Sequence, residues 1–367
     1  MGKKIILENK REKNKISQRK QDHLDICLNP DEYAVEAGGS SSFDQVHFVH
    51  NALPEINFEK VETEVEFLQM KLKLPLLISC MTGGSIDGLN ANLALAKVAQ
   101  STGIAIGLGS IRPAIVNKDA VEHFSVKKHA PDVPVLANIG AVQLRDIGIG
   151  KLASLLAKLE VQALVIHLNV GQELFQSNGD RNFCGLLDAI ARSVANLKLP
   201  VVVKETGFGI RPKLVNQLLN YGVEYVDVAG SGGTNWITVE GYRESNISAG
   251  RVSTFASWGI PTAVILASLK DSKNKIIASG GLRDGLQLSK AIALGAITGG
   301  MALPFIRAVI TEGVEGAIRF VDRVSYELKV AMTLSGANSI SELQRVPVMK
   351  SRVFQDQVEA LNNVDQK

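Results

Sequence analysis

The sequence has little of what marks secreted, membrane-spanning or thiolate-bound metal proteins. Aromatic residues make up only 5% of its 367 residues while glycine is abundant at 33, a balance that favours an α/β protein over a β-sandwich. The three cysteines, Cys27, Cys80 and Cys184, form no CxxC pattern, so we expect reduced thiols in or near the core. Because no apolar run approaches about twenty residues and no secretory signal opens the chain, we expect a cytoplasmic protein without membrane contact.

Net charge is small, but it is unevenly distributed. The overall value is +3, whereas the first twenty residues carry eight lysines and arginines against only Glu8 and Glu12. Such an excess can meet an anionic ligand, and a solvated tail is the alternative. Nucleic-acid binding is not favoured, because the five tyrosines and two tryptophans are not interleaved with the basic run.

Short apolar runs alternate with amphipathic stretches along most of the chain, and each run is typical of a buried strand. The predicted strands are 74–81, 104–109, 133–139, 163–168, 200–204, 225–229, 275–279 and 296–302; helices are predicted over 88–102, 146–160, 185–198, 213–221 and 284–294. Alternating units of this kind give a parallel sheet, and eight of them indicate an α/β fold of the (β/α)8 TIM barrel type. An open, doubly wound sheet is the rival, although no GxGxxG follows the first strand.

The barrel predicts three regions. Residues 71–347 form the barrel itself, residues 1–70 an N-terminal extension that packs outside it, and residues 348–367 a C-terminal tail. Between 230 and 262 lies a segment rich in Gly, Ser and Thr that is too long for an ordinary connection. We expect it to be an insertion after strand six that covers the barrel mouth.

Four polar residues follow the fourth predicted strand: His167, Asn169, Gln172 and Glu173. Because side chains alternate along a strand, His167 and Asn169 should share a face. A turn at Gly171 is predicted to bring Gln172 and Glu173 beside them. A polar strand end with a capped turn is the structural alternative to a reactive site.

Other strands end in polar or glycine-rich groups as well, and barrel enzymes build their sites at this end of the strands. The groups are 81–84, 109–112, Asn138, Lys204 with Glu205, 230–234 and 280–283. The pair of glycines after strand seven, followed by Arg283 and a helix, favours a bound phosphate, with a tight turn as the alternative. We therefore expect a phosphorylated cofactor or substrate.

Several motifs occur in the order found in one enzyme family. They are MetThrGlyGly, GlySer-x-Arg, HisLeuAsn-x-x-GlnGlu, ValLysGlu-x-GlyPheGly, AspValAlaGly-x-GlyGlyThr-x-Trp, TrpGlyIleProThr and AlaSerGlyGly-x-Arg-x-Gly. From Arg19 to Pro347 the chain resembles the type 2 isopentenyl diphosphate isomerases. The resemblance implies an isomerase that interconverts isopentenyl and dimethylallyl diphosphates, requires reduced FMN and Mg²⁺, and uses NAD(P)H only as the reductant of the flavin.

The resemblance also implies roles for individual residues. The cofactor contacts it implies are Met81, Thr82, Gly83, Ser110, Asn138, Lys204, Thr234, Gly281, Arg283, Ala302 and Leu303. The substrate contacts are Arg19, Lys20, His23, Ser110, Arg112, His167, Asn169 and Gln172, with Glu173 as the Mg²⁺ ligand. A lysine at a strand end is otherwise often a surface group, but near a flavin the ammonium of Lys204 would stabilise the anionic reduced ring.

Moving a double bond requires adding one proton and removing another, and an alkene is a poor base. The resemblance assigns this work to the reduced flavin, with Gln172, Glu240 and Lys204 as the catalytic side chains. Gln172 would position or relay, since an amide is not a general base, and Glu240 would be its partner from the same or a neighbouring subunit. An exposed loop carboxylate is the alternative for Glu240.

The chain departs from the family pattern at two places. Val170 and Gly171 stand where the family has Pro-Leu, and Ile111 stands where it has Gln, which puts the placement of Gln172 and the affinity for substrate in doubt. The family implies a homo-oligomer, a tetramer or octamer. Two other functional classes remain open: an FMN barrel oxidoreductase of the hydroxy-acid oxidase or dihydroorotate dehydrogenase type, and a non-catalytic phosphate-binding or partner-binding protein.

Overall fold

Eight parallel strands close into a barrel in the computed structural model, which describes residues 18–36, 38–81, 86–244, 249–269, 272 and 274–366. The barrel strands are β4 (Leu76–Ile78), β5 (Ala105–Ser110), β6 (Val135–Gly140), β7 (Ala163–Leu168), β8 (Val201–Glu205), β9 (Tyr225–Asp227), β10 (Ile276–Ala278) and β11 (Thr298–Met301). They neighbour one another in chain order, and β11 pairs with β4 to close the ring. The eight predicted strands and the (β/α)8 barrel are thus confirmed.

Burial on both faces explains why these strands are continuous apolar runs. Every residue of β6 and of β8 is buried, as expected for parallel strands covered by helices on one side and by the barrel interior on the other. A large apolar cluster fills the space between strands and helices, and a smaller one lies inside the barrel. All the helices predicted from periodicity are present.

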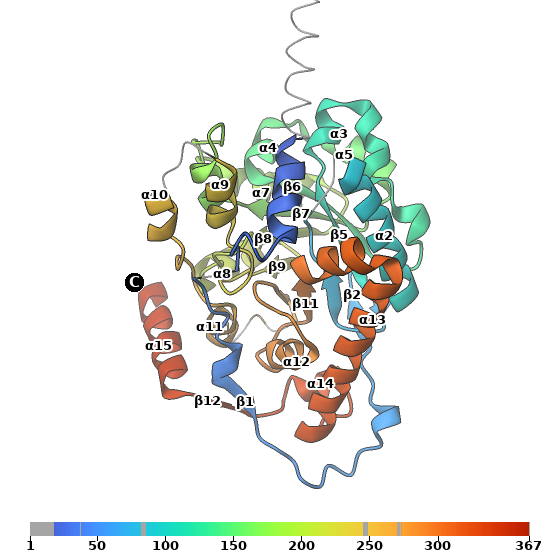
Figure 1. Ribbon diagram of the computed structural model, residues 1–367, viewed down its shortest axis with the longest axis vertical. Coiled ribbons are helices and arrows are strands. Elements are labelled where there is room, and N and C mark those ends of the chain that lie inside the picture. The colour runs from blue at the N-terminus through green and yellow to red at the C-terminus, as the bar shows by residue number, and fades with distance from the viewer. Residues whose placement is uncertain are drawn as a thin grey trace, which may run out of the picture.

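Helices surround the barrel (Figure 1). Those of at least nine residues are α2 (Ile86–Thr102), α5 (Ile149–Leu159), α7 (Leu186–Asn196), α8 (Pro212–Asn220), α12 (Gly285–Ala293), α13 (Leu303–Ser335) and α15 (Arg352–Gln366). The shorter ones are α3 (Arg112–Val116), α4 (Ala141–Asp146), α6 (Val170–Phe175), α9 (Trp236–Arg243), α10 (Ala249–Thr254), α11 (Thr262–Ser268) and α14 (Ile340–Leu343). The predicted insertion after strand six contains α9 and α10, before α11 resumes the barrel pattern.

A hairpin of β2 (Val65–Phe67) and β3 (Met70–Leu72) closes the lower end of the barrel, which is the end where the barrel strands begin. Phe67, Leu68 and Leu72 are buried against interior residues of six barrel strands. The expectation that residues 1–70 lie outside the barrel is therefore wrong for this hairpin, because its apolar tip fills space that the inward-facing side chains leave. The turn holds Leu68 and Gln69 at φ of 52° and 60°, a conformation that L-residues seldom adopt.

The N-terminal region meets both ends of the barrel. Residues 18–28 form a helical segment, drawn in dark blue in Figure 1, whose side chains reach the barrel mouth. Further on, β1 (Val46–Phe48) pairs antiparallel with β12 (Val348–Lys350), and the C-terminal α15 packs against α8 and α11. The boundaries predicted at residues 70 and 347 stay predictions.

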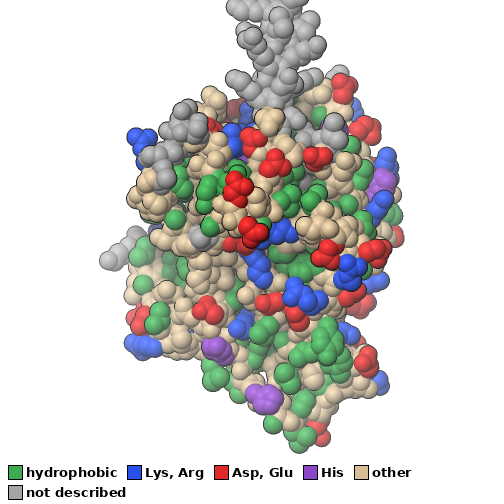
Figure 2. All heavy atoms as spheres, viewed as in Figure 1, with side chains coloured by type: hydrophobic (Ala, Val, Ile, Leu, Met, Phe, Trp, Pro, Cys, Tyr) green, Lys and Arg blue, Asp and Glu red, His purple; other side chains and the backbone are tan. Residues whose placement is uncertain are grey.

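Surface charge and apolarity agree with the composition. Figure 2 shows Lys and Arg side chains interspersed with Asp and Glu over one face, so the described residues of this face form no extended patch of a single sign. Across the described ranges, no helix combines the length and apolarity needed to cross a membrane. Of the cysteines, Cys27 is buried and Cys80 partly so, but Cys184 is exposed, and its expected place in or near the core is wrong.

Candidate active site

A pocket that is open to solvent lies where the carboxyl ends of all eight barrel strands meet. Nearly every residue predicted for the site lines it. These are Arg19, Lys20, His23, Met81, Ser110, Arg112, Asn138, His167, Asn169, Gln172, Glu173, Lys204, Thr234, Gly281, Arg283, Ala302 and Leu303. Glu240 lies behind the wall, and Thr82 and Gly83 lie outside the described residues.

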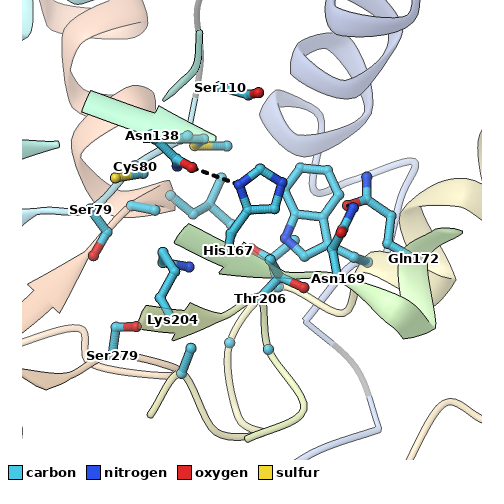
Figure 3. Close-up of a pocket in the computed structure, with 18 of the residues that line it drawn as sticks. Ser79, Cys80, Ser110, Asn138, His167, Asn169, Gln172, Lys204, Thr206 and Ser279 are labelled. Carbon is cyan, nitrogen blue, oxygen red and sulfur yellow. Dashed lines mark hydrogen bonds between the residues drawn. The ribbon is translucent and has the colours of Figure 1, made fainter. Parts of the chain in front are cut away.

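His167 ends β7 and faces the pocket beside Asn138 of β6 (Figure 3). Its Nδ1 donates to Asn138 Oδ1 at 2.6 Å. Burial, followed by the nearby charges of Lys204 and Lys20, lowers the pKa of His167 to about 3. The imidazole is therefore neutral at physiological pH, and the ring is fixed in orientation by a neighbouring strand.

Lys204 occupies the next strand, opposite His167 in the β7–β8 register. It is buried, and its Nζ donates to the carbonyl of Glu205 at 2.5 Å. Glu205 turns away from the pocket and accepts backbone N–H groups, among them Gly207 at 2.6 Å. The pKa of Glu205 is raised to about 7. Burial raises it, and the surrounding N–H donors and Lys204 offset only part of that effect. The hydrogen bond to the Glu205 carbonyl fixes the Lys204 side chain at the floor of the pocket.

Asp227 lies next to Lys204 in the β8–β9 register. It is buried and accepts the Ser279 hydroxyl at 2.6 Å. Burial raises the pKa of Asp227, while the charge of Lys204 and the Ser279 hydrogen bond favour its ionised form. A polar layer of carboxylate, hydroxyl and ammonium therefore underlies this side of the pocket.

Arg19, Lys20 and Arg112 gather positive charge on the opposite side. Burial and then the charges of Arg19 and Arg112 lower the pKa of Lys20 to about 7, and burial lowers the pKa of Arg19 as well. Lys20 donates to the Ser110 carbonyl at 3.3 Å, whereas Arg19 Nε is buried with no partner in the described part of the chain. Like charges held together this closely are costly unless an anion joins them.

Asn169, Gln172 and Glu173 converge as predicted, but through a short helix, α6, rather than a turn at glycine. Gly171 does not adopt a positive φ. A side chain there would approach Phe208 Cε2 to 2.9 Å, so the glycine allows close packing of α6 instead. Glu173 accepts from Asn169 Nδ2 at 2.8 Å and from the backbone N–H of Asp180 at 2.8 Å, which aims its carboxylate.

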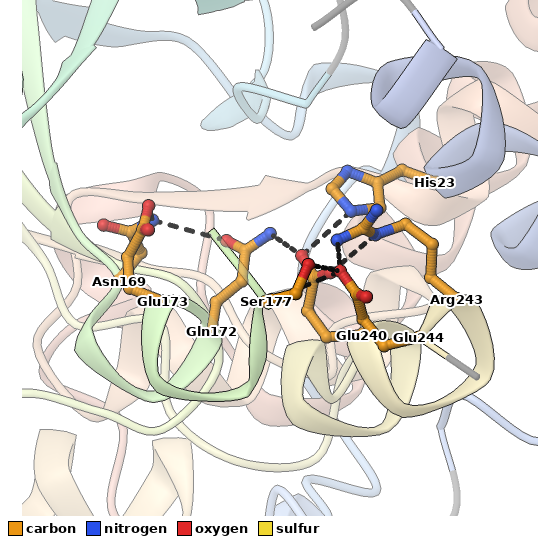
Figure 4. A network of polar contacts seen from close by, with 8 residues as sticks. All are labelled: His23, Asn169, Gln172, Glu173, Ser177, Glu240, Arg243 and Glu244. Atoms are coloured by element: carbon orange, nitrogen blue, oxygen red, sulfur yellow. Dashed lines mark hydrogen bonds and ion pairs between the residues drawn. The ribbon is translucent and has the colours of Figure 1, made fainter. Parts of the chain in front are cut away.

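Glu240, on α9, is fully buried, so the alternative of an exposed loop carboxylate does not hold. Figure 4 shows its carboxylate accepting hydrogen bonds from three side chains: His23 and Gln172, each at 2.9 Å, and Arg243 at 2.8 Å. Burial alone would raise the pKa of Glu240, but these hydrogen bonds and charges outweigh it and lower the pKa to about 2. Gln172 is thereby linked within one chain to a permanently charged group.

Glycines form a narrow cradle after β9 and β10. Gly280 and Gly281 both have positive φ, near 95°, and a side chain at Gly233 would come within 2.9 Å of the Gly281 nitrogen. Arg283 follows the glycines at the mouth of the pocket, and α13 begins at Leu303, just after the neighbouring strand β11. Close backbone approach, a guanidinium and a helix N-terminus together suit a phosphate group.

Sequence reasoning missed several lining residues: Ser79, Cys80, Gln143, Gln176, Thr206, Trp236 and Ser279. Ser79, Cys80 and Ser279 lie one or two residues before strand-end groups that were already identified, so starting those groups two residues earlier would have found them. Ser79 lines the pocket, and its Oγ is buried with no hydrogen-bond partner among the described residues. Gln143 and Gln176 carried no signal of their own.

Comparison with known proteins gives the family. A profile described as FMN-dependent dehydrogenase matches residues 158–350. An isopentenyl-diphosphate delta-isomerase from Borrelia garinii subsp. bavariensis is 42% identical over 331 residues, covering 90% of this chain and 92% of the relative. One of the same name from Rickettsia bellii is 41% identical, covering 92% of this chain and 98% of the relative. The chain belongs to the isopentenyl-diphosphate delta-isomerase family.

Solved structures agree with the barrel but lie further away than the isomerases. Lactate oxidase from Pediococcus acidilactici has a TM-score of 0.63 at 16% identity, covering 86% of this chain and 89% of that one. Flavocytochrome b2 has a TM-score of 0.63 at 19% identity, covering 89% and 80%. At these identities the likeness shows the barrel fold alone.

Proposed function

We propose that this protein interconverts isopentenyl and dimethylallyl diphosphates, with reduced FMN in the barrel mouth and Mg²⁺ on the diphosphate. The observation that carries the proposal is the pairing, at one pocket, of a partly buried cation cluster with the Gln172–Glu240 contact. The cluster suits a diphosphate, and the contact suits proton handling a short distance away. The isomerase relatives, which match nearly the whole chain, support the same reaction.

The residues present fit FMN. The glycine cradle with Arg283, Ala302 and Leu303 would hold its phosphate, and Met81, Ser110, Asn138 and Thr234 would border the rest; Thr82 and Gly83 remain predicted contacts. The unpartnered Ser79 hydroxyl would find a hydrogen-bond partner there. Reduced FMN supplies the acid and base strength that an unactivated alkene requires. In this proposal NAD(P)H serves only to reduce the flavin.

Arg19, Lys20 and Arg112 would bind the diphosphate, with His23, Ser110, His167 and Asn169 around it. Burial first and mutual repulsion second lower the pKa values of Arg19 and Lys20, and an anion that enters the site would offset both effects. The same anion raises the pKa of His167, whose present value reflects burial and the nearby Lys204. The negative charge of the diphosphate would thus be balanced by the positive charges of Arg19, Lys20 and Arg112.

Mg²⁺ would be held by Glu173 and by substrate oxygens. Within the described residues, no group of three or more His, Cys, Asp or Glu side chains could hold a metal ion without other ligands. Glu173 is buried at the pocket wall and its two oxygens are oriented by Asn169 and Asp180. One carboxylate plus phosphate oxygens is a donor set that suits Mg²⁺, so the ion would bind together with the diphosphate.

Gln172 and Lys204 would orient the reacting parts from two sides. Gln172 donates one amide N–H to Glu240, and its oxygen accepts weakly from Asn169 Nδ2 at 3.5 Å. These two contacts would hold the amide beside the alkene end of the substrate. The ammonium of Lys204 would stabilise negative charge on the reduced cofactor.

An FMN-dependent oxidation of a hydroxy acid is the weaker alternative. Such a reaction needs a dedicated base beside the flavin. His167, the histidine at the end of a barrel strand here, has a pKa of about 3 and already donates its Nδ1 proton to Asn138. A neutral ring of so low a pKa is a poor base, whereas isomerisation does not require it to be one.

One experiment tests the reaction class. Anaerobic protein loaded with reduced FMN and Mg²⁺ is incubated with isopentenyl diphosphate in heavy water and followed by NMR. We expect dimethylallyl diphosphate carrying deuterium, with no net change in flavin absorbance. Bleaching of oxidised FMN by a 2-hydroxy acid, in protein that leaves isopentenyl diphosphate unchanged, would favour the oxidoreductase, and protein that acts on neither compound would reject both.

We further infer that the active form is a homo-oligomer, a tetramer or octamer, in the cytoplasm. Phe255 and Trp258 of the insertion meet edge to face, with 5.9 Å between ring centroids, and are exposed in the single chain. Exposed aromatic pairs of this kind are common at subunit interfaces. Light scattering of the purified protein measures the state, and a monomer at micromolar concentration would reject it.

A further inference from the structure

One carboxylate joins two arginines at the edge of the glycine cradle. Glu36 Oε1 accepts from Arg283 Nη2, and Glu36 Oε2 accepts from Arg307 Nη1 at 3.0 Å. Arg283 follows β10, whereas Arg307 lies on α13, four residues after Leu303. The three side chains are 31%, 32% and 28% exposed, in the order Glu36, Arg283 and Arg307, so they form a linked group at the rim.

Arg307 extends this link to the helical segment 18–28. Its Nη2 and Nε donate to the carbonyl of Cys27 at 3.1 and 3.3 Å. Cys27 lies in the last turn of the segment, where carbonyl groups lack partners within the helix. A guanidinium there satisfies the carbonyl and interacts favourably with the negative end of the helix dipole. Arg19 and Lys20 lie on the same segment.

We propose that Glu36 couples the phosphate cradle to the substrate helix as a positioning residue. The inference rests on the proposed function, since it takes the cradle as the FMN phosphate site and segment 18–28 as the diphosphate site. Glu36 would act at both sites through the arginines it holds. It would touch neither ligand.

The two effects of Glu36 have opposite signs. Its negative charge competes with a phosphate for Arg283 and repels that phosphate, so removing the charge should strengthen FMN binding. The same removal breaks the bridge from Arg283 to Arg307, which loosens the segment that carries Arg19 and Lys20, and diphosphate binding should weaken. If Glu36 only held the fold together, its replacement would instead weaken the binding of both ligands.

The test uses the full chain and Glu36→Gln, an isosteric change that removes the charge and leaves one of the two acceptor oxygens. FMN affinity is measured from quenching of flavin fluorescence, and affinity of the FMN-loaded protein for inorganic pyrophosphate with Mg²⁺ by calorimetry. We expect the Kd of FMN to fall about two- to fivefold and the Kd of pyrophosphate to rise by about the same factor, the range of partly exposed ion pairs. Glu32→Gln is the control, because Glu32 accepts from Asn29 in the same region, and both constants should stay unchanged.

A second variant approaches the bridge from the other side. Arg307→Gln leaves Glu36 with Arg283 alone, so FMN as well as pyrophosphate should bind more weakly than in the wild-type protein. Constants that Glu36→Gln leaves unchanged, or shifts in the same direction, would overturn the coupling while leaving the isomerase function standing. Wild-type protein that binds neither FMN nor pyrophosphate would overturn the proposed function and the coupling with it.

Discussion

Gln172 Nε2 donates to Glu240 Oε1 at 2.9 Å, a contact that joins the helix after β7 to the insertion after β9. The carboxylate also receives His23 from the N-terminal segment and Arg243 from its own helix. Three separate parts of the chain thus fix one amide at the wall of the pocket. Several outcomes depend on this arrangement and on the charges around it.

Replacing Glu240 by Gln should slow isomerisation by about a hundredfold, the range seen for groups that position proton transfer. The substitution removes the charge that Gln172, His23 and Arg243 share, while FMN binding should be retained. The measurement is kcat with isopentenyl diphosphate. Glu244→Gln is the matched control, since Glu244 bonds to Arg243 and Ser177, and its kcat should stay close to wild type. An unaltered rate in Glu240→Gln would exclude the role.

Binding of pyrophosphate with Mg²⁺ should weaken as pH rises above 7. Burial and neighbouring arginines lower the pKa of Lys20 to about 7, so the free protein loses this proton above pH 7 while a bound anion restores it. From this one group, affinity should fall at most about tenfold per pH unit between roughly pH 7 and 9. Lys20→Arg, which keeps its charge, should lose the Lys20 part of the slope and leave only that of the ligand. Calorimetry in buffers of different ionisation enthalpy should detect proton uptake in the wild-type protein only.

The lowered pKa of Lys20 also makes the free energy of unfolding depend on pH. The folded value for Lys20 lies below the unfolded one, so between about pH 7 and 10.5 the unfolded chain binds the extra proton. Stability contributed by this group therefore rises with pH across that window. In the Lys20→Arg protein this rise should be absent from the free energy of unfolding.

Glu173→Gln should raise the Mg²⁺ concentration needed for half-maximal activity by at least about tenfold, because the amide keeps hydrogen-bonding capacity but loses the charged ligand oxygen. FMN binding should not change. Asp180→Asn serves as the control: the Asp180 side chain bonds to Gln143, and only its backbone meets Glu173. An Mg²⁺ response equal to wild type in Glu173→Gln would assign the ion to other ligands.

Lys204→Met should make the two-electron reduction potential of bound FMN more negative, by roughly 30 mV for each 1.4 kcal/mol of lost stabilisation. The buried ammonium would otherwise favour the anionic reduced ring. Lys198→Met, an exposed change just before the same strand, provides the comparison. Equal potentials in the two variants would place Lys204 too far from the flavin to tune it.

Gln69→Gly should stabilise the fold by about 0.5–1 kcal/mol, because Gln69 has a φ of 60° in the turn of the lower hairpin. The same replacement at the neighbouring extended residue Glu66 should destabilise by a similar amount. Urea unfolding measures both. Destabilisation by Gln69→Gly would indicate that its side chain contributes more than its backbone conformation costs.

The barrel and most of its mouth could be predicted from the sequence because both depend on local patterns. Strands buried on both faces are continuous apolar runs, and groups at their carboxyl ends must converge once the barrel closes. Lys204 and His167 were therefore placed together correctly although 37 positions apart in the chain, as neighbours in adjacent strands.

Contacts set by packing between distant segments left no such trace. The helix at Val170–Phe175 depends on the close approach of Gly171 to Phe208, which a turn-forming glycine does not suggest. The bond between Glu36 and Arg283 spans 247 positions, and neither neighbourhood hints at it. The hairpin tip at Leu68 and Gln69 contains neither glycine nor asparagine, so its turn had no sequence signal.

The hairpin of β2 and β3 stops the barrel at one end with Phe67, Leu68 and Leu72, as far as the described chain extends. In the proposed function, substrate and product would therefore enter and leave by the same opening, beside residues 18–28. The next substrate can bind only after the product has left, which makes this rim the place where product release is controlled.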